Sequence, residues 1–355
     1  METVFTFSRH ERKNIMKKII ATFLLLLTLT APLFGCDNSD ISEASDPKNA
    51  SDSISDTSNG GIAADFEYSV IRDGTISIDK YIGNAAEVVI PDTIDGIPVT
   101  LIEISAFSGT PIKKVVIPET VTTIDSSAFE ACGLLEKVIL PSKLRTLGKN
   151  AFSCCESLSF IELPASLEHL GREAFKDCKN LKSLCIPPNC LEAGNNSLFK
   201  NSGIETLELS EGIASIPDMC FGNMPALKKL ILPTTLKEIG YNAISGCPNL
   251  EGIILPEGLE TIRSSAFSYN SGLTEITIPK SVRHICSNVF AGCESLEKII
   301  FEGNAPENIW YSDDPEKTEY YHSYKDADHY TIYYHKGAKG FTSPTWYDYP
   351  AQEIE

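Results

Sequence analysis

Cysteine is the residue type in this sequence that could most directly support chemistry, because a thiolate can act as a nucleophile, a disulfide partner or a metal ligand. The chain contains 11 cysteines. Their spacing does not match a zinc site, because Cys154 and Cys155 are adjacent and no histidine follows at a zinc interval. Five of them stand three positions after a recurring phenylalanine position: Cys132, Cys155, Cys178, Cys247 and Cys293.

We expect these five residues to be buried structural thiols at a corner of the fold. Equivalent positions in adjacent repeats would lie about 4.8 Å apart, which is close enough for a disulfide, but parallel Cβ vectors disfavour the required dihedral angle. A disulfide or a metal site is kept as an alternative. Cys185 and Cys190, five residues apart across a turn, are the pair best placed for a disulfide.

Histidines near the C-terminus form a second candidate site. His322, His329 and His335 share a segment with Asp326 and Asp328, and imidazole together with carboxylate is a metal-binding combination. The same segment is rich in tyrosine, whose rings are suited to covering the open end of a repeat array. We expect an end cap here, with a metal or ligand site as the alternative.

Other catalytic patterns are missing from the sequence. It contains no nucleophile elbow, phosphate loop or HExxH motif. Aspartate and glutamate are numerous but scattered, so no catalytic carboxylate pair can be argued. His169 and His284 take the place that Thr123, Thr146 and Thr261 fill elsewhere, and we expect them to face solvent. The sequence therefore predicts no enzymatic activity, no cofactor and no bound metal.

A repeat of 22 to 24 residues must position all these side chains. Its main landmark is a small residue followed by an aromatic one, at Ala106-Phe107, Ala128-Phe129, Ala151-Phe152, Ala174-Phe175, Leu198-Phe199, Cys220-Phe221, Ala243-Ile244, Ala266-Phe267 and Val289-Phe290. A second landmark, an apolar pair closed by proline, recurs at Pro118, Pro141, Pro164, Pro187, Pro233, Pro256 and Pro279. Self-similarity at a fixed period of this length predicts a solenoid.

One repeat shows how a coil is built. Leu135, Val138 and Leu140 follow the L-x-x-L-x-L spacing of a leucine-rich strand, and side chains two residues apart point to the same side of it. Pro141 cannot donate a hydrogen bond and ends the strand. Gly148 is expected to permit the next corner through its backbone freedom. The recurring phenylalanines should form a continuous stack through the core.

The pattern Ile-Pro…Val-x-x-Ile…Ala-Phe-x-x-Cys-x-x-Leu resembles the BspA-type leucine-rich repeats of bacterial surface proteins. The resemblance covers about residues 66–349, with Ser210 replacing an expected proline and Ile244 an expected phenylalanine. Residues 68–99 resemble the N-terminal repeat of that family and residues 333–346 its C-terminal cap. The resemblance implies a repeat solenoid with β-rich coils of about 23 residues and a parallel concave sheet at 63–301, followed by a cap at 302–355.

The N-terminal segment is predicted to be a lipoprotein signal peptide, residues 1–35. Basic residues from Arg12 to Lys18 precede an apolar run from Ile19 to Phe34 that is too short to span a membrane. The sequence Leu33-Phe34-Gly35-Cys36 resembles a bacterial lipobox, which implies lipidation of Cys36 and anchoring to the bacterial membrane. An uncleaved anchor and ordinary cleavage nearby are the alternatives. Met16 is an alternative start of translation.

Residues 36–62 consist almost entirely of Ser, Asp, Asn, Gly and Ala, and they predict a disordered acidic tether. The chain has a formal net charge of −18. Nucleic acids and anionic lipid surfaces are bound through clustered Lys and Arg, so this charge argues against both as partners of the folded part.

Two outward-facing positions on each repeat strand vary along the chain. Val and Ile recur at one of them, although a solvated strand face usually carries polar residues. The predicted binding face is Lys137, Ile139, Phe160, Glu162, Cys185, Glu208, Lys229, Ile231 and Ile254. The alternative is that β-branched residues are present only because they suit strands.

The family resemblance implies adhesion, or capture of a protein or glycan, at the cell surface through the concave sheet. A scaffold that binds envelope proteins of the same cell is a second hypothesis. A glycan-active surface enzyme is a third, and it would need a pocket with two close carboxylates.

Overall fold

The computed structural model describes residues 62–191, 197–311, 330–347 and 349–355. The predicted signal peptide, Cys36 and all of the predicted tether except its last residue lie outside the described residues. The chain divides into two compact units, Met1–Asp52 and Ser53–Glu355, and every described residue belongs to the second. No helix in the described part has the length and apolar character needed to cross a membrane.

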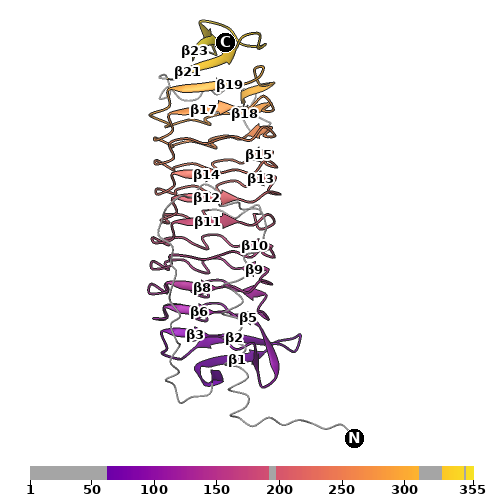
Figure 1. The fold of residues 1–355 in the computed structure, drawn as a ribbon, viewed down its shortest axis with the longest axis vertical. Coiled ribbons are helices and arrows are strands. Elements are labelled where there is room, and N and C mark those ends of the chain that lie inside the picture. The colour runs from indigo at the N-terminus through magenta and orange to yellow at the C-terminus, as the bar shows by residue number, and fades with distance from the viewer. Residues whose placement is uncertain (1–61, 192–196, 312–329, 348) are drawn as a thin grey trace, which may run out of the picture. The chain divides into compact units, whose positions relative to one another are not determined.

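The described residues confirm the predicted solenoid. They form about 11 turns of parallel β-structure, and two columns of strands run side by side along the stack (Figure 1). The first column, named here the first ladder, contains β3 (Glu87–Val89), β6 (Lys114–Val116), β8 (Lys137–Ile139), β11 (Ser183–Ile186), β12 (Thr206–Leu209), β14 (Lys229–Ile231), β17 (Glu275–Ile278), β19 (Lys298–Phe301), β21 (Thr331–His335) and β23 (Tyr349–Ile354).

The second ladder is built from shorter strands on the return path of each coil. It contains β5 (Ile97–Ile102), β7 (Thr123–Ile124), β9 (Thr146–Leu147), β10 (His169–Leu170), β13 (Ser215–Ile216), β15 (Glu238–Ile239), β16 (Thr261–Ile262), β18 (His284–Cys286) and β20 (Asn308–Tyr311). At the N-terminal end, a 3₁₀ turn (Ile62–Asp65) leads into β1 (Phe66–Val70), which pairs antiparallel with β2 (Ile76–Tyr81). The short strand β4 (Thr93–Ile94) pairs antiparallel with β5, and β22 (Thr345–Trp346) pairs antiparallel with β23.

Adjacent strands of the central coils pair in a one-repeat register. Leu184 pairs with Leu207, and Leu207 pairs with Leu230. These residues point inward and are buried, while the residues on either side of them face outward. Alternation along a strand therefore separates a core column from two surface columns in every coil, as the L-x-x-L-x-L spacing predicts.

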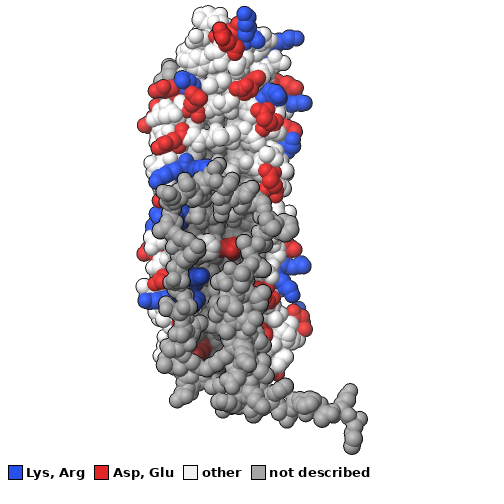
Figure 2. Space-filling model, in the orientation of Figure 1, with Lys and Arg blue, Asp and Glu red and all other residues white. Residues whose placement is uncertain are grey.

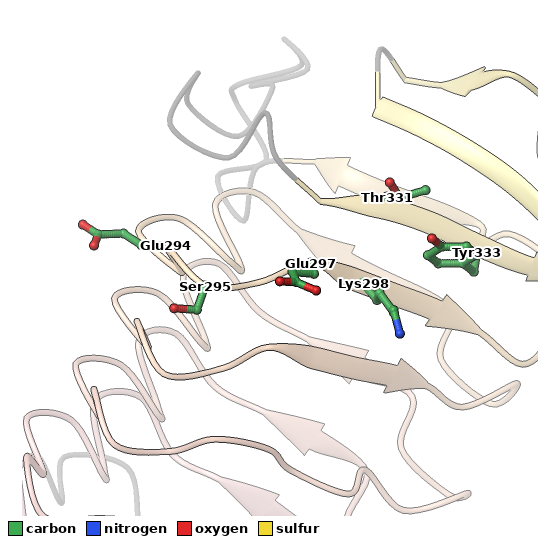
Figure 3. A pocket seen from close by; sticks show the side chains of 6 residues that line it. All are labelled: Glu294, Ser295, Glu297, Lys298, Thr331 and Tyr333. Atoms are coloured by element: carbon green, nitrogen blue, oxygen red, sulfur yellow. The ribbon is translucent and has the colours of Figure 1, made fainter.

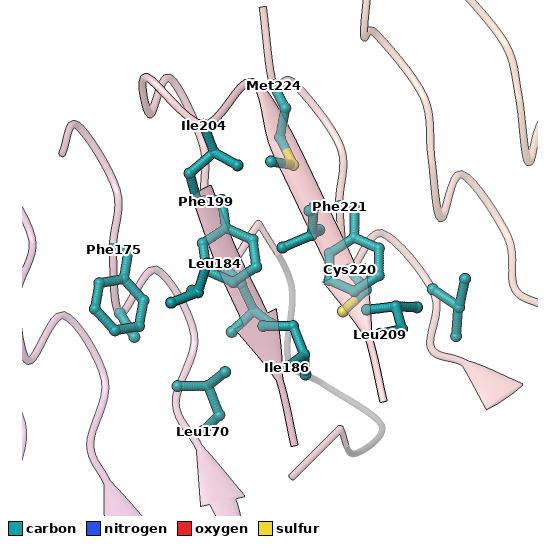
Figure 4. Close-up of a cluster of buried hydrophobic side chains, with 14 of the residues drawn as sticks. Leu170, Phe175, Leu184, Ile186, Phe199, Ile204, Leu209, Cys220, Phe221 and Met224 are labelled. Atoms are coloured by element: carbon teal, nitrogen blue, oxygen red, sulfur yellow. The ribbon is translucent and has the colours of Figure 1, made fainter. Parts of the chain in front are cut away.

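The recurring phenylalanines stack along the core, as the sequence predicts. Ring centroids of Phe129 and Phe152 lie 5.1 Å apart with nearly parallel planes, and those of Phe152 and Phe175 lie 5.7 Å apart. The stack runs from Tyr81 to Phe221, and Figure 4 shows its last members, Phe175, Phe199 and Phe221. It is interrupted at the aliphatic Ile244 and resumes with Phe267 and Phe290 at 6.0 Å.

Gly148 is required for a reason different from the one the sequence predicts. Its backbone does not adopt a positive φ. A Cβ atom at Gly148 would instead lie 2.5 Å from the backbone nitrogen of Ser126, and one at Gly171 would lie 2.4 Å from the carbonyl carbon of Gly148. Adjacent coils approach too closely at this corner for any side chain.

Aromatic side chains gather at the C-terminal end of the stack. Strands β21 and β23 continue the first ladder beyond Phe301. Phe301 contacts Phe341 and Trp346, and Phe341 stacks on Tyr334 with a centroid distance of 4.7 Å. The assignment of 302–355 as a cap stays a prediction, because residues 312–329 lie outside the described part.

Candidate binding surface

The outward-facing residues at equivalent positions of successive coils along the first ladder are named here the strand face. It consists of two columns. The first column contains Glu87, Lys114, Lys137, Phe160, Ser183, Thr206, Lys229, Gly252, Glu275, Lys298 and Thr331. The second column contains Val89, Val116, Ile139, Glu162, Cys185, Glu208, Ile231, Ile254, Thr277, Ile300 and Tyr333. All nine residues of the predicted binding face lie on these two columns.

Large apolar side chains on this face reach solvent. Ile254 is 88% exposed and Phe160 is 57% exposed. Ile139 and Ile231 are half-buried between their strand neighbours. A solvated strand face that carries this much apolar area is typical of a contact surface.

The two most exposed apolar residues of the face coincide with two interruptions of the first ladder. Phe160 makes only an isolated bridge to Lys137, and residues 252–254 form no strand. Between these interruptions, β11, β12 and β14 form a separate three-stranded segment. The apolar spacing of these two coils is the same as in the others, and the signal that could have marked one of them is Gly252, because glycine weakens a strand.

Charged side chains of the first column are paired at its two ends. Lys114 Nζ lies 3.6 Å from a Glu87 oxygen, and Lys298 Nζ lies 3.3 Å from a Glu275 oxygen. In the described part of the chain, the ammonium groups of Lys137 and Lys229 make no ion pair. These two lysines are therefore the cations of the column that are open to a ligand.

In the described part of the chain, the second column contains two carboxylates, Glu162 and Glu208, and no Lys or Arg side chain. Glu162 is exposed and Glu208 is half-buried. Within the described ranges neither carboxylate accepts a hydrogen bond or forms an ion pair. Cys185 lies between them, with its sulfur 3.4 Å from the hydroxyl oxygen of Ser210. The column thus offers two unpaired negative charges about 10 Å apart, at about 4.8 Å per strand.

The five cysteines expected at a corner of the coil are buried there, as predicted. Their thiols donate hydrogen bonds to backbone carbonyl oxygens. Cys132 donates to the carbonyl oxygen of Phe107 at 3.0 Å, Cys155 to that of Phe129 at 3.1 Å, and Cys178 to that of Phe152 at 3.1 Å. Each thiol thus supplies a hydrogen bond to the phenylalanine carbonyl of the preceding coil, where water cannot reach.

Burial also suppresses the reactivity of these thiols. It raises the pKa of Cys178, Cys247 and Cys293 to about 12. Burial and the neighbouring sulfurs of Cys178 and Cys132 raise the pKa of Cys155 further. Because the thiolate is the nucleophile and the metal ligand, these residues serve packing and not chemistry.

Cys185 and Cys190, the pair considered for a disulfide, are not bonded to each other. Cys190 donates its thiol hydrogen to the carbonyl oxygen of Pro187 at 3.3 Å, and the sulfur of Cys185 faces Ser210. Among the described residues, no three His, Cys, Asp or Glu side chains are grouped as a metal site would require. His322 and His329 lie outside the described residues. His335 contacts Glu302, with Nε2 and Oε2 3.4 Å apart.

A shallow pocket at the C-terminal end of the strand face was missed by the sequence reasoning. Lys298, Thr331 and Tyr333 project into it from β19 and β21, and Glu294, Ser295 and Glu297 line it from the preceding turn (Figure 3). The signal that could have found it is the continuation of both columns into Thr331 and Tyr333 beyond the last regular repeat.

Acidic and basic side chains alternate along both edges of the view in Figure 2, without a large patch of one sign outside the grey region. Many of these charges pair between adjacent coils. Arg145 lies 3.4 Å from Glu168, Lys237 lies 3.3 Å from Glu260, and Glu205 accepts contacts from both Lys182 and Lys228. These basic residues therefore form ion pairs within the solenoid.

The sequence model described as "BspA type Leucine rich repeat region" matches residues 100–198 and 194–309, with six copies. The chain belongs to the BspA-type leucine-rich repeat family. The predicted family and the predicted fold are therefore both confirmed. A search of curated proteins finds no match.

Solved structures similar to this BspA-type chain are bacterial leucine-rich repeat proteins. A leucine-rich repeat protein of T. pallidum is 30% identical, with 53% of this chain and 89% of that chain covered and a TM-score of 0.50. One from Bacteroides ovatus is 21% identical, with coverages of 82% and 98% and a TM-score of 0.44. A leucine-rich cell surface protein of Faecalibacterium prausnitzii is 21% identical, with coverages of 72% and 97% and a TM-score of 0.32.

Proposed function

We propose that this chain is a non-enzymatic surface protein of a bacterium that captures a protein or glycan ligand through the strand face. The observation that carries the proposal is the second column, in which Ile254 is 88% exposed and is covered by nothing in the described part of the chain. Burying that apolar area against a ligand would yield roughly 25 cal/mol per Å² before the costs of association.

The family supports the same proposal. In this chain the outer columns of the first ladder vary from coil to coil while its core column repeats. A surface of this kind can recognise an extended partner without a convergent pocket. The half-buried Ile139 and Ile231 and the unpaired Lys137, Lys229, Glu162 and Glu208 supply the apolar and charged contacts that recognition needs.

The test is a screen of the purified full chain against extracellular matrix proteins and a glycan array, followed by hydrogen–deuterium exchange on each complex. We expect protection in β8, β11, β12 and β14 when the ligand is bound. Protection confined to the second ladder would contradict the assignment of the strand face. Protease treatment of intact cells separates the adhesin from an envelope scaffold, because only a cell-surface protein is cleaved.

The anchor is part of the proposal. Lipidation of Cys36 would hold the solenoid at the outer side of a bacterial membrane, with residues 37–62 as the connecting segment. A Cys36→Ser variant should be released into the medium, and the wild-type N-terminal peptide should carry the mass of acyl chains. A wild-type mature chain that begins elsewhere and carries no acyl group would refute the anchor.

A further inference from the structure

The second column between Ile139 and Ile231 has a chemically symmetric order. Ile139 is followed by Glu162, Cys185, Glu208 and then Ile231, with one residue contributed by each coil. Direct pairing of Cys185 with Glu208 and of Glu208 with Ile231 fixes the register of its last three members. Neighbouring strands lie about 4.8 Å apart, so Ile139 and Ile231 are about 19 Å apart along the stack, with the carboxylates about 5 Å and 14 Å from Ile139.

Further apolar side chains lie close to this five-residue series. Ile254, the most exposed large apolar residue of the described chain, follows Ile231 on the next coil. Phe160 lies two residues before Glu162 on the same outward side of its coil. An aromatic ring next to a carboxylate favours a cationic partner, because the ring face and the carboxylate both attract positive charge.

The charge of the column also selects a cationic partner. From Val89 to Tyr333 the described second column contains no Lys or Arg, and its two carboxylates make no hydrogen bond or ion pair. Lys137 and Lys229 lie about 7 Å away on the first column, two residues back along the strand. A basic ligand displaced onto the first column would meet like charges, so the lysines restrict it to the second column.

An extended peptide has a side-chain spacing that fits these positions. It advances about 3.3 Å per residue and places every second side chain on the same face, at about 7, 13 and 20 Å from the first. The column offers contacts at about 5, 14 and 19 Å. The differences are no more than about 2 Å, which a flexible lysine side chain spans easily.

We propose that the strand face binds an extended peptide segment that lies along the solenoid axis, with two apolar side chains six residues apart and two basic side chains between them. The apolar side chains contact Ile139 and Ile231, and the basic ones pair with Glu162 and Glu208. This inference rests on the proposed function, because it names the partner class of the same face.

The experiment uses a fluorescein-labelled nonapeptide with Leu at its second and eighth positions, Lys at its fourth and sixth, and Ser elsewhere. Binding to the purified full chain is followed by fluorescence anisotropy at low salt. We expect saturable binding that is at least tenfold weaker when both lysines are replaced by glutamate. We also expect at least threefold weaker binding when one leucine is moved by one position, because the two anchors then point to opposite sides.

Substitutions in the protein test which carboxylates are responsible. The double variant Glu162→Gln, Glu208→Gln should bind the lysine and glutamate peptides within twofold of each other. The matched control Glu156→Gln, Glu257→Gln, which changes two exposed carboxylates outside both columns, should keep the tenfold preference. Both are surface substitutions, and equal thermal melts verify that the fold is unchanged.

Equal binding of the lysine and glutamate peptides by the wild-type chain would overturn this inference, and so would a full charge preference in the Glu162→Gln, Glu208→Gln variant. If a ligand from the screen protects the strand face while the peptides show neither charge nor spacing preference, the proposed function stands and only the peptide assignment fails. If no complex protects the strand face, the proposed function fails as well.

Discussion

The thiol of Cys155 donates a hydrogen bond to the carbonyl oxygen of Phe129, 26 positions earlier in the chain, over 3.1 Å. The same contact recurs between Cys178 and Phe152 and between Cys293 and Phe267. In one coil the cysteine is replaced by Asn270, whose side-chain amide donates to the carbonyl oxygen of Ile244 at 2.8 Å. In these coils the position supplies a buried donor to a carbonyl oxygen of the preceding coil, and cysteine does so without reactive chemistry, whereas the equivalent Met224 after Phe221 is buried without being such a donor.

Removing this donor should destabilise the fold. Cys155→Ala leaves the buried carbonyl of Phe129 without its side-chain donor and opens a small cavity, so we expect the free energy of unfolding to fall by about 1–3 kcal/mol. Urea denaturation followed by circular dichroism measures the change. Cys154→Ala is the matched control, because Cys154 is partly exposed and its sulfur lies 3.6 Å from the Ser153 hydroxyl rather than on a buried carbonyl. Equal losses in the two variants would refute the role of the bond.

Ser202 gives the converse prediction. It occupies the cysteine position after Phe199, and its buried hydroxyl oxygen has no hydrogen-bond partner among the residues that the structure describes. A Cys side chain is longer, because the C–S bond exceeds the C–O bond by about 0.4 Å, and it should reach the carbonyl oxygen of Phe175. Ser202→Cys should raise the free energy of unfolding by about 1 kcal/mol. Ser202→Ala only removes the unpaired hydroxyl, so a Cys variant no more stable than the Ala variant would contradict the prediction.

The raised thiol pKa values predict sensitivity to alkali. A thiol has an ordinary pKa near 9.0, and burial raises the pKa of Cys178, Cys247 and Cys293 to about 12. The unfolded state therefore releases protons at a lower pH than the folded state, and the contribution of these thiols is complete below pH 9 and is lost between pH 9 and 12. Denaturation midpoints should fall across that range. The Cys178→Ala variant should show a shallower fall, and an identical pH profile would refute this cause.

Two phenylalanines that are close in sequence occupy different environments, one in the core and one on the surface. Phe152 is fully buried in the aromatic stack, whereas Phe160 is 57% exposed on the strand face. Phe152→Ala should lower the free energy of unfolding by about 3–5 kcal/mol, because it opens a cavity between two stacked rings. Phe160→Ala should change it by no more than about 1 kcal/mol. Comparable losses in thermal melts of the two variants would show that the core assignment is wrong.

The repeat makes most of this fold predictable from sequence. Val138 and Leu184 are buried, and Ile139 and Cys185 face outward, as the two-residue alternation predicts. The stacking of Phe152 also follows from the spacing, but the stack is not continuous as predicted, because the aliphatic Ile244 interrupts it. Each coil repeats the same local choices, so one interpreted repeat predicts the core of its neighbours.

Features that depend on contacts between coils could not be predicted in this way. The close approach at Gly148 is set by the backbone of the preceding coil, and Gly148 was expected to act through its own backbone freedom. The bond from Cys155 to Phe129 requires knowledge of which atoms meet across two coils. The strand interruptions at Phe160 and Ile254 are differences in backbone geometry between coils with the same apolar pattern.

The most direct test of the central claim is the affinity of a captured ligand for two triple variants. One variant carries Ile139→Thr, Ile231→Thr and Ile254→Thr on the strand face. The other carries Ile82→Thr, Ile104→Thr and Leu134→Thr, which changes three exposed apolar residues outside both columns. We predict at least tenfold weaker binding for the first variant and wild-type binding for the second, with both variants folded. Wild-type affinity in a folded first variant would contradict the claim that the strand face binds the ligand.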